Sequence, residues 1–211
     1  MARPTKVLLT RQRIVEAASL VVDDEGLDAL SLRRLATELG VQGPSLYNHF
    51  ATKAEIVDAV VDAVVDAVVA QVDISAFGSY DWPEALRLWA KSYRAVLSAH
   101  PNIVPVLAQG PRRRPASLAM AEAVYGALID AGFSEARAVH VGALLRYMVI
   151  GSALGSFALG FDVDPALYER YPHLRRAPLL AAHHVAVDEG AFELGLETIL
   201  LGLEARFARI G

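Results

Sequence analysis

The segment from Leu30 to Phe50 gathers hydrogen-bonding side chains along one edge of a short predicted helix. Leu46 and Phe50 are four residues apart, so both face the same side of that helix, where they can be buried. An α-helix fits the major groove of DNA, and polar side chains on its outer edge suit base edges and phosphates. The side chains that can project outward here are those of Ser45, Tyr47, Asn48 and His49.

The residues before this segment predict that it forms the second half of a helix-turn-helix unit. Ser31 can cap a short helix over 32–39, and Gly40 can end it because glycine accepts the left-handed conformation. Pro44 can then begin a second short helix. Two short helices joined by a tight turn with glycine are typical of that unit. Such pairs also occur in proteins that do not bind DNA, so the pattern alone leaves that alternative open.

Positive charge surrounds the predicted unit. Residues 1–13 hold four basic side chains and no acidic one, although the whole chain has a net charge of −4. A basic arm is usually just solvated, but cations beside a helix-turn-helix can contact phosphate oxygens. Arg33 and Lys53 are the two further candidates for such contacts.

Apolar periodicity predicts helices along the rest of the chain and no convincing strand, so the expected fold class is all-α. Thr10 can cap a first helix that Gly26 ends. A Val-Asp-Ala repeat within 52–71 predicts a long helix with a solvent-exposed aspartate face and a wide buried valine face. Arg112–Arg114, between prolines, is predicted to be an exposed loop. The other expected helices cover 82–99, 116–131, 134–160 and 188–209.

Composition excludes several classes of protein. The chain has 211 residues, of which 54% are hydrophobic, so it can bury a core and is not disordered. We find no apolar run of the roughly 18 residues that a membrane span needs and no signal peptide. We therefore expect a cytoplasmic protein with no membrane partner. Cysteine is absent, which removes disulfides and thiolate chemistry.

The sequence string of residues 40–60, GVQGPSLYNHFATKAEIVDAV, resembles the TetR family of transcriptional repressors, as does the stretch 13–36. This resemblance implies a helix-turn-helix DNA-binding domain over 1–53 and a helical-bundle domain for ligand binding and dimerisation over 54–211. It also implies that the positions contacting operator DNA are Arg33, Gly43, Pro44, Ser45, Tyr47, Asn48, His49 and Lys53.

Two of these residues depart from the tetracycline-repressor branch of the family. Gly43 stands where that branch has a base-reading glutamine, and Asn48 replaces its aromatic residue. The resemblance therefore implies the same mode of reading DNA but not the same operator sequence.

The region after residue 80 resembles the tetracycline-repressor branch of C-terminal domains, in the stretch 82–111 and in the AGFS turn at 131–134. Domains of that branch bind small molecules and dimerise, and its tetracycline site uses a histidine to ligate magnesium. The matching position here is near Leu107, where no imidazole stands. We therefore expect no metal and no cofactor.

Aromatic and polar side chains in this region are candidates for a small-molecule site, with ordinary core packing as the alternative for each. Arg146 interrupts an apolar helix, so its charge needs a core acid, a dimer mate or an anionic ligand. Phe157 could form a wall. The ligand-binding candidates are Trp89, Tyr93, His100, Tyr125, Arg146 and Tyr147.

A second polar cluster consists of His183, His184 and Asp188. It could ligate a metal, but a solvated loop or a dimer contact is the favoured interpretation, because a metal site needs more ligands in register.

Taken together, the sequence predicts a ligand-responsive repressor that binds a palindromic operator as a homodimer and is released by a small, largely apolar effector. The helices at 134–160 and 188–209 are expected to form the subunit interface as a four-helix bundle. One alternative is a helical protein-interaction module without DNA affinity. The other is an all-α enzyme, for which no nucleophile with a base and an orienting group can be assembled.

Overall fold

The computed structural model describes residues 9–71, 77–108, 114–161 and 164–207, with all side chains in these ranges except those of Tyr47, Val68 and Val69. The described residues form helices and contain no strand, which confirms the predicted all-α class. The α-helices are α1 (Arg11–Glu25), α2 (Leu32–Leu39), α3 (Lys53–Gln71), α4 (Trp82–Ala99), α5 (Val104–Ala108), α6 (Pro115–Asp130), α7 (Glu135–Ala153), α8 (Ala177–Ala182) and α9 (His184–Phe207).

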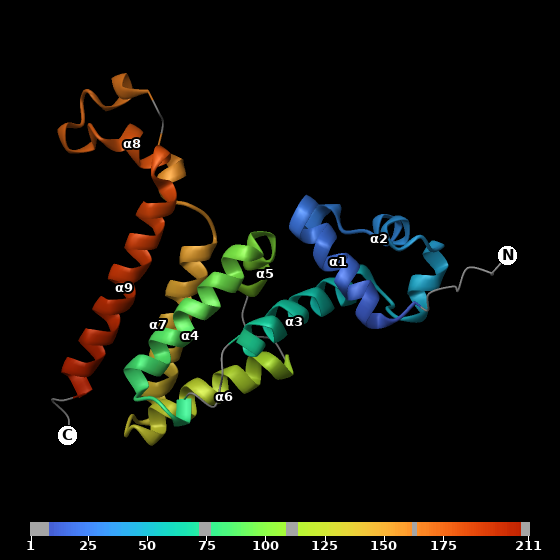
Figure 1. The fold of residues 1–211 in the computed structure, drawn as a ribbon, viewed down its shortest axis with the longest axis horizontal. Coiled ribbons are helices and arrows are strands. Elements are labelled where there is room, and N and C mark those ends of the chain that lie inside the picture. The colour runs from blue at the N-terminus through green and yellow to red at the C-terminus, as the bar shows by residue number, and fades with distance from the viewer. Residues whose placement is uncertain (1–8, 72–76, 109–113, 162–163, 208–211) are drawn as a thin grey trace.

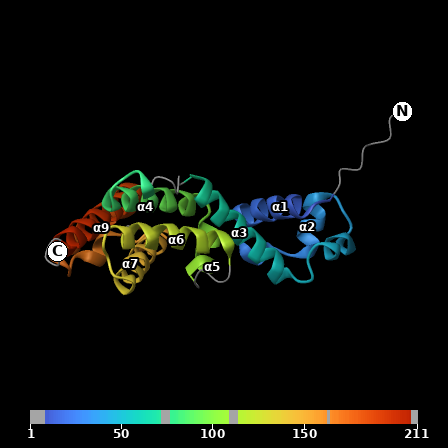
Figure 2. The ribbon, with the colours of Figure 1, turned by 90° about the horizontal axis from the view of Figure 1, so that it is seen from below.

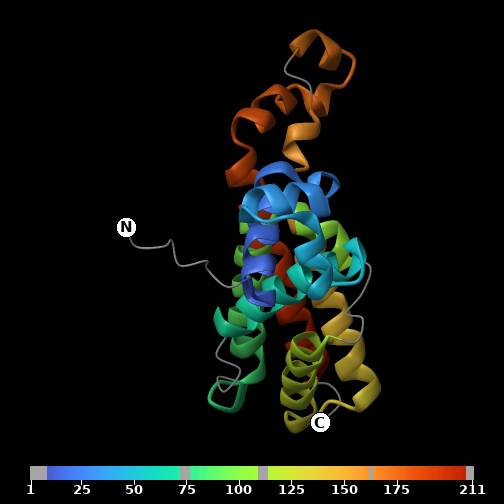
Figure 3. The ribbon, with the colours of Figure 1, turned by 90° about the vertical axis from the view of Figure 1, so that its right-hand side faces the viewer.

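The chain is elongated, with a small helical head at one end and a helical bundle at the other (Figure 1). α1, α2 and a short 3₁₀ helix, η2 (Gly43–Asn48), form the head. α3 leads from the head to the bundle and packs against α1 as well as against α4 and α6. Figure 2 shows the head and the bundle at opposite ends of the long axis. The stretch around α8 projects beyond the bundle, as Figure 3 shows at the top of the view.

Local capping defines the head as the sequence predicts. The Thr10 hydroxyl accepts a hydrogen bond from the Arg13 amide at 3.2 Å, and the Ser31 hydroxyl accepts one from the Arg34 amide at 3.1 Å. Gly40 ends α2 with a φ of 64°, in the left-handed region that favours glycine. These caps fix the directions of α1 and α2, and therefore the place of the turn between α2 and η2.

The second half of the helix-turn-helix unit differs from the expected α-helix, because it is the 3₁₀ helix η2. Its first turn contains Pro44, and the His49 amide donates to the Leu46 carbonyl three residues back at 2.9 Å. A segment of six residues completes few bonds of the α-helical pattern, so the tighter pattern dominates.

The aspartate face of α3 is less exposed to solvent than the repeat predicts. The valines Val60, Val61, Val64 and Val65 are buried as expected. Asp62, on the opposite face, is however 2.6 Å from the Nε of Arg114, and Asp58 is 3.2 Å from its Nη2. Arg114 is only 4% exposed, so the predicted exposed loop is wrong at this residue. A buried guanidinium needs carboxylate partners, and α3 supplies two. Arg112 and Arg113 lie outside the described residues.

Two predicted helix boundaries also differ. The helix expected over 134–160 ends at Ala153, and Gly155 follows in the irregular stretch, where the low helix propensity of glycine favours termination. The helix expected to begin at Asp188 begins at His184. No helix in the described ranges is long and apolar enough to span a bilayer.

Candidate nucleic-acid interface and ligand cavity

The head carries an exposed polar surface on η2 and its neighbours. Leu46 is fully buried and Phe50 is 2% exposed, so both anchor the segment from inside, as predicted. Asn48 and His49 between them are exposed to solvent. The side chain of Tyr47 lies outside the described part. Of the remaining candidates, Gly43 and Ser45 are half-buried, and the exposed ones are Arg33, Pro44 and Lys53.

The two neighbouring arginines of α2 differ in whether they form ion pairs within the head. Arg34 is held by Glu25 at 2.6 Å and by Glu38 at 2.8 Å, and these partners raise the pKa of its guanidinium above the ordinary value. Arg34 therefore ties α2 to the end of α1. Its neighbour Arg33 points to solvent on the outer side of α2. A cation of this kind can reach a phosphate without breaking an internal pair.

Lys53 is positioned by a well-defined turn at the start of α3. The Thr52 hydroxyl accepts a hydrogen bond from the Glu55 amide at 3.2 Å, and the Glu55 carboxylate accepts one from the Ala51 amide at 2.9 Å. Reciprocal bonds of this type fix the entry angle of a helix. The turn therefore holds Lys53 at the same end of the head as η2.

In the bundle, α4, α6 and α7 enclose a cavity of about 530 Å³. This volume falls in the range of small-molecule pockets, and the lining is mostly apolar. Five of the six ligand-binding candidates from the sequence line the cavity: Trp89, Tyr93, Tyr125, Arg146 and Tyr147.

The polar groups of this cavity include three from buried side chains, and Arg146 is half-buried. Trp89 and Tyr93 are 3% and 1% exposed, and their rings pack with centroids 5.6 Å apart. Burial raises the pKa of the Tyr93 hydroxyl, and the nearby Arg146 charge partly opposes that rise. Arg146 donates a hydrogen bond to the Leu107 carbonyl at 2.7 Å. Ser117, which is 5% exposed, adds a hydroxyl from α6.

Gly142 on α7 allows the ring of Tyr125 to pack directly on the helix backbone. A Cβ placed at this glycine would lie 2.4 Å from Cε1 of Tyr125, which is closer than real side chains tolerate. The absence of a side chain at Gly142 therefore sets the position of one aromatic wall of the cavity.

We expect Gly142→Ala to move the Tyr125 ring and to weaken ligand binding by about tenfold, because a well-packed wall relaxes only by shifting side chains. The binding of a fluorescent aromatic probe, measured by titration, checks this. Gly151→Ala is the matched control, since Gly151 also lines the cavity but has open space where its Cβ would stand. Equal probe affinity in both variants would contradict this role of Gly142.

His100 does not line the cavity, so the prediction that it belongs with the other candidates needs correction. It follows the last residue of α4, and its Nδ1 is 2.9 Å from both carboxylate oxygens of Asp23 on α1. Asn102 also donates to the Val22 carbonyl at 2.9 Å. These contacts join the bundle to the head instead. Phe157 is likewise outside the lining and is 73% exposed.

The second polar cluster forms no metal centre among the described residues, where no group of three or more suitable ligands comes together. His184 and Asp188 line a shallow pocket with Arg94, and the Nδ1 of His184 is 3.0 Å from the Ala181 carbonyl. His183 contacts the Leu179 carbonyl at 2.9 Å in the same way. Both rings are thus engaged with the end of α8.

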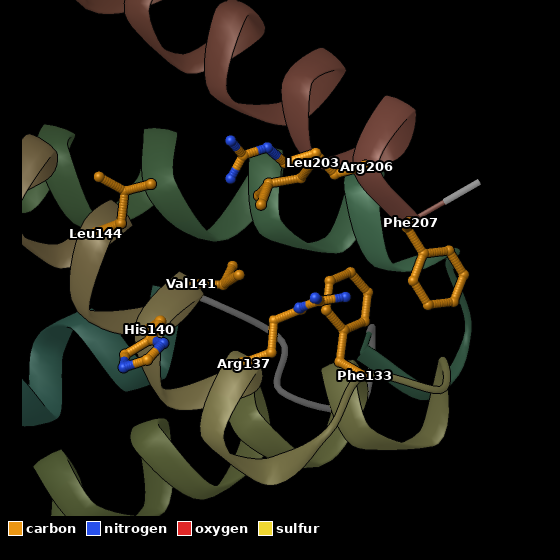
Figure 4. Close-up of a pocket in the computed structure, with 8 residues that line it drawn as sticks. All are labelled: Phe133, Arg137, His140, Val141, Leu144, Leu203, Arg206 and Phe207. Carbon is orange, nitrogen blue, oxygen red and sulfur yellow. The ribbon is translucent and has the colours of Figure 1, made fainter. Parts of the chain in front are cut away.

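A different cavity, of about 520 Å³, lies between the start of α7 and the end of α9. Figure 4 shows Arg137, His140 and Leu144 along α7, and Arg206 and Phe207 along α9, on two sides of this opening. At its end the rings of Phe133 and Phe207 stack at a centroid distance of 4.6 Å. Half of the eight residues around it are exposed, among them Arg137, His140 and Arg206, so this cavity is a groove that opens on the outer face of the bundle.

Of the residues that α6 contributes to the ligand cavity, the sequence predicted Tyr125 but not the others. Ser117, Met120 and Val124 face the cavity at helical spacing. A single hydroxyl within an otherwise apolar stripe is a signal that the sequence does contain. Aromatic side chains give a stronger signal of a ligand site than one small hydroxyl does, because they supply most of the contact area in such pockets.

Comparison with known proteins assigns both regions. Residues 14–60 match the model of bacterial regulatory proteins of the tetR family, and residues 76–207 match the tetracyclin repressor-like C-terminal domain. The tetracycline repressor protein class A from transposon 1721, from Escherichia coli, is 32% identical over 200 residues, which cover 92% of this chain and 89% of that protein.

Other relatives agree. An HTH-type transcriptional regulator of Saccharopolyspora erythraea is 37% identical over 148 residues, 70% of this chain but only 61% of that longer relative. A possible TetR family transcriptional regulator from Streptomyces coelicolor A3(2) superimposes with a TM-score of 0.75 at 30% identity, over 93% of this chain and 99% of that one. ActR of Streptomyces coelicolor in complex with actinorhodin superimposes with a TM-score of 0.72 at 30% identity, over 94% and 98%. The chain belongs to the TetR family of bacterial transcriptional regulators.

Proposed function

We propose that this protein is a repressor that binds a palindromic operator as a homodimer and releases it when a small effector fills the cavity between α4, α6 and α7. The exposed polar edge of η2, anchored from inside by Leu46 and Phe50, is the observation that carries this proposal. We divide the chain into a DNA-binding domain over 1–53 and a ligand-binding and dimerisation domain over 54–211. The class of the relatives supports a regulator over an enzyme or a protein-interaction module.

The proposed DNA contacts follow from that exposed edge. Asn48 and His49 would face base edges, while Arg33 and Lys53 would pair with phosphates on either side. Gly43, Pro44 and Ser45 would bring the backbone of η2 close to the duplex. Tyr47 completes the proposed set by the family resemblance alone.

Exposed apolar side chains on the outer face of the bundle support the homodimer. On α9, Phe192, Leu196 and Leu200 are buried against the protomer, whereas Leu194 and Leu201 are 71% and 62% exposed. At about 100° per residue these two leucines lie opposite Phe192, and they are seven residues apart. α7 adds Val139, Leu144 and Tyr147, which are also exposed. Such a patch suits an isologous contact with a second copy.

Ion pairs hold α9 in place so that this face stays available. Arg87 of α4 pairs with Glu197 at 2.7 Å, and Lys91 pairs with Glu193 at 2.7 Å. Both pairs lie on the side of α9 that faces α4. Leu194 and Leu201, at 71% and 62% exposed, face solvent, where a partner can cover them.

DNA binding is tested with a duplex selected by the wild-type protein from a random-sequence library. We expect Lys53→Ala to weaken binding by about tenfold and to lower the slope of log affinity against log salt by about one, because one phosphate contact is lost. Fluorescence anisotropy over a series of salt concentrations measures both quantities. The matched control is Arg170→Ala, which removes an exposed cation outside the head.

Unchanged affinity and slope in Lys53→Ala would remove Lys53 from the interface. Failure of the wild-type protein to enrich any duplex would favour the interaction-module alternative and would overturn the repressor proposal.

A further inference from the structure

Arg146 has a hydrogen-bond partner but no counter-charge. Its Nη2 donates to the Leu107 carbonyl, and among the described residues no carboxylate forms an ion pair with it. Arg87 pairs with Glu84 and Glu197, and Arg114 pairs with Asp58 and Asp62. Arg94, which is half-buried like Arg146, also has no carboxylate partner among the described residues, but its guanidinium lies over the ring of Phe192 at 4.6 Å. A partly buried cation is costly without an opposite charge, and Arg146 is the arginine of this kind that lines the cavity between α4, α6 and α7.

Trp89, which lines the same cavity as Arg146, carries an unsatisfied donor. The Nε1 of Trp89 is buried and has no hydrogen-bond partner, although the side chain is only 3% exposed. An indole N–H can donate but cannot accept, and a guanidinium has the same restriction. A buried donor without an acceptor is rare in folded proteins and calls for an explanation.

The remaining lining offers neither group an acidic partner. Among the described residues that line the cavity, Arg146 is the one charged side chain and no aspartate or glutamate is present. The hydroxyls of Tyr93, Ser117 and Tyr125 can donate as well as accept. The cavity thus supplies hydrogen-bond donors and positive charge, and the molecule that fills it must supply oxygen acceptors and negative charge.

The apolar walls restrict the rest of that molecule. The Tyr125 ring packs against α7 at Gly142, and Trp89 and Tyr93 pack against each other on α4. Aromatic rings favour offset or edge contacts with other rings over contacts with flexible chains. A volume of about 530 Å³ accommodates two or three fused rings.

We propose that the effector is an aromatic anion, whose acidic group pairs with Arg146 and accepts a hydrogen bond from Trp89 while its rings lie against Tyr125. This inference rests on the proposed function and narrows its largely apolar effector to a class with one acidic group. Arginine suits that role because its planar fork binds an oxyanion through two parallel hydrogen bonds.

Two naphthalene probes with the same ring skeleton test the charge directly. 1-Anilinonaphthalene-8-sulfonate is an anion, whereas N-phenyl-1-naphthylamine lacks the sulfonate. By fluorescence titration of the full-length protein, we expect the anion to bind at least about tenfold more tightly than the neutral probe. Arg146→Met should abolish this preference and leave the neutral probe within about twofold of its wild-type affinity, while Arg146→Lys should retain most of it.

Control variants separate the cavity from other cationic surfaces. Arg170→Met removes an exposed arginine outside both cavities and should change neither titration. Loss of the anion preference in Arg137→Met, with no loss in Arg146→Met, would move the probe to the groove between α7 and α9 and overturn the proposal. Equal wild-type affinity for both probes, or equal weakening of both by Arg146→Met, would also overturn it.

Two further measurements distinguish this inference from the proposed function. If light scattering shows that Arg146→Met is monomeric, Arg146 pairs with a partner subunit and the ligand assignment is wrong. If the wild-type protein binds its selected duplex but shows no anion preference, the effector class fails and the repressor proposal stands. If the preference is present but no duplex is bound, the repressor proposal fails and the cavity chemistry stands.

Discussion

Replacing both Leu194 and Leu201 with glutamate is expected to convert the protein into a monomer and to lower its operator affinity by at least about 100-fold. Each glutamate would place a charge in a contact between apolar faces, where it has no partner. A monomer engages one half-site only, and two linked half-sites bind about 10² to 10⁴ times more tightly than one. Light scattering should report one chain of 22.7 kDa instead of two.

The control for this experiment is Leu118→Glu, which makes the same change at an exposed leucine on α6, a helix that does not belong to the proposed interface. It should remain dimeric and bind DNA normally. A dimer in the double variant, with an unchanged dissociation constant, would show that the subunits meet elsewhere. Circular dichroism of both variants checks that helix content is preserved, since the substituted side chains are exposed in the protomer.

Elements governed by local interactions could be predicted from the sequence. α1 and α2 begin at Thr10 and Ser31 because each hydroxyl caps amides within three residues, and α2 ends at Gly40 because of the left-handed turn there. The burial of Leu46 and Phe50 follows from their spacing alone. The exposed polar edge of η2 could therefore be predicted from the sequence of residues 30–50 alone.

Contacts between distant parts of the chain could not be predicted in this way. His100 contacts Asp23, which is 77 residues earlier in the chain. Arg114 contacts Asp58, which is 56 residues earlier, and it also pairs with Asp62. A cation between prolines has the same local signature whether it is solvated or buried. Only the packing of α6 against α3 decides, and no periodicity in the sequence reports that packing.

The ion pairs of Arg114 predict a second large effect. Replacing both Asp58 and Asp62 with asparagine should lower the free energy of unfolding by about 3 to 5 kcal/mol, because it leaves a buried guanidinium without a counter-charge. Arg114→Met should cost less, since Asp58 and Asp62 have side chains that are 45% and 42% exposed and can be solvated by water. Urea denaturation followed by circular dichroism measures both changes.

Asp66→Asn is the matched control, since it makes the same substitution one turn further along α3 at an exposed carboxylate. It should change the free energy of unfolding by less than about 0.5 kcal/mol. If the double asparagine variant were no less stable than this control, the Arg114 guanidinium would not depend on these two carboxylates, and the assigned role of the ion pairs would be wrong.

The variant that removes all three charges, Arg114→Met with Asp58→Asn and Asp62→Asn, should recover most of the stability that the double variant loses. Burial raises the pKa of Asp62 above its ordinary value, and the Arg114 charge opposes that rise only in part. Burial and the neighbouring carboxylates thus offset part of the attraction between Asp62 and Arg114, so removing the whole cluster removes a cost along with a gain. If the triple variant recovers stability, Asp58 and Asp62 stabilise the fold by compensating the buried charge of Arg114. A triple variant as unstable as the double variant would instead place the loss in hydrogen bonds that the aspartates make on α3 itself, independently of Arg114.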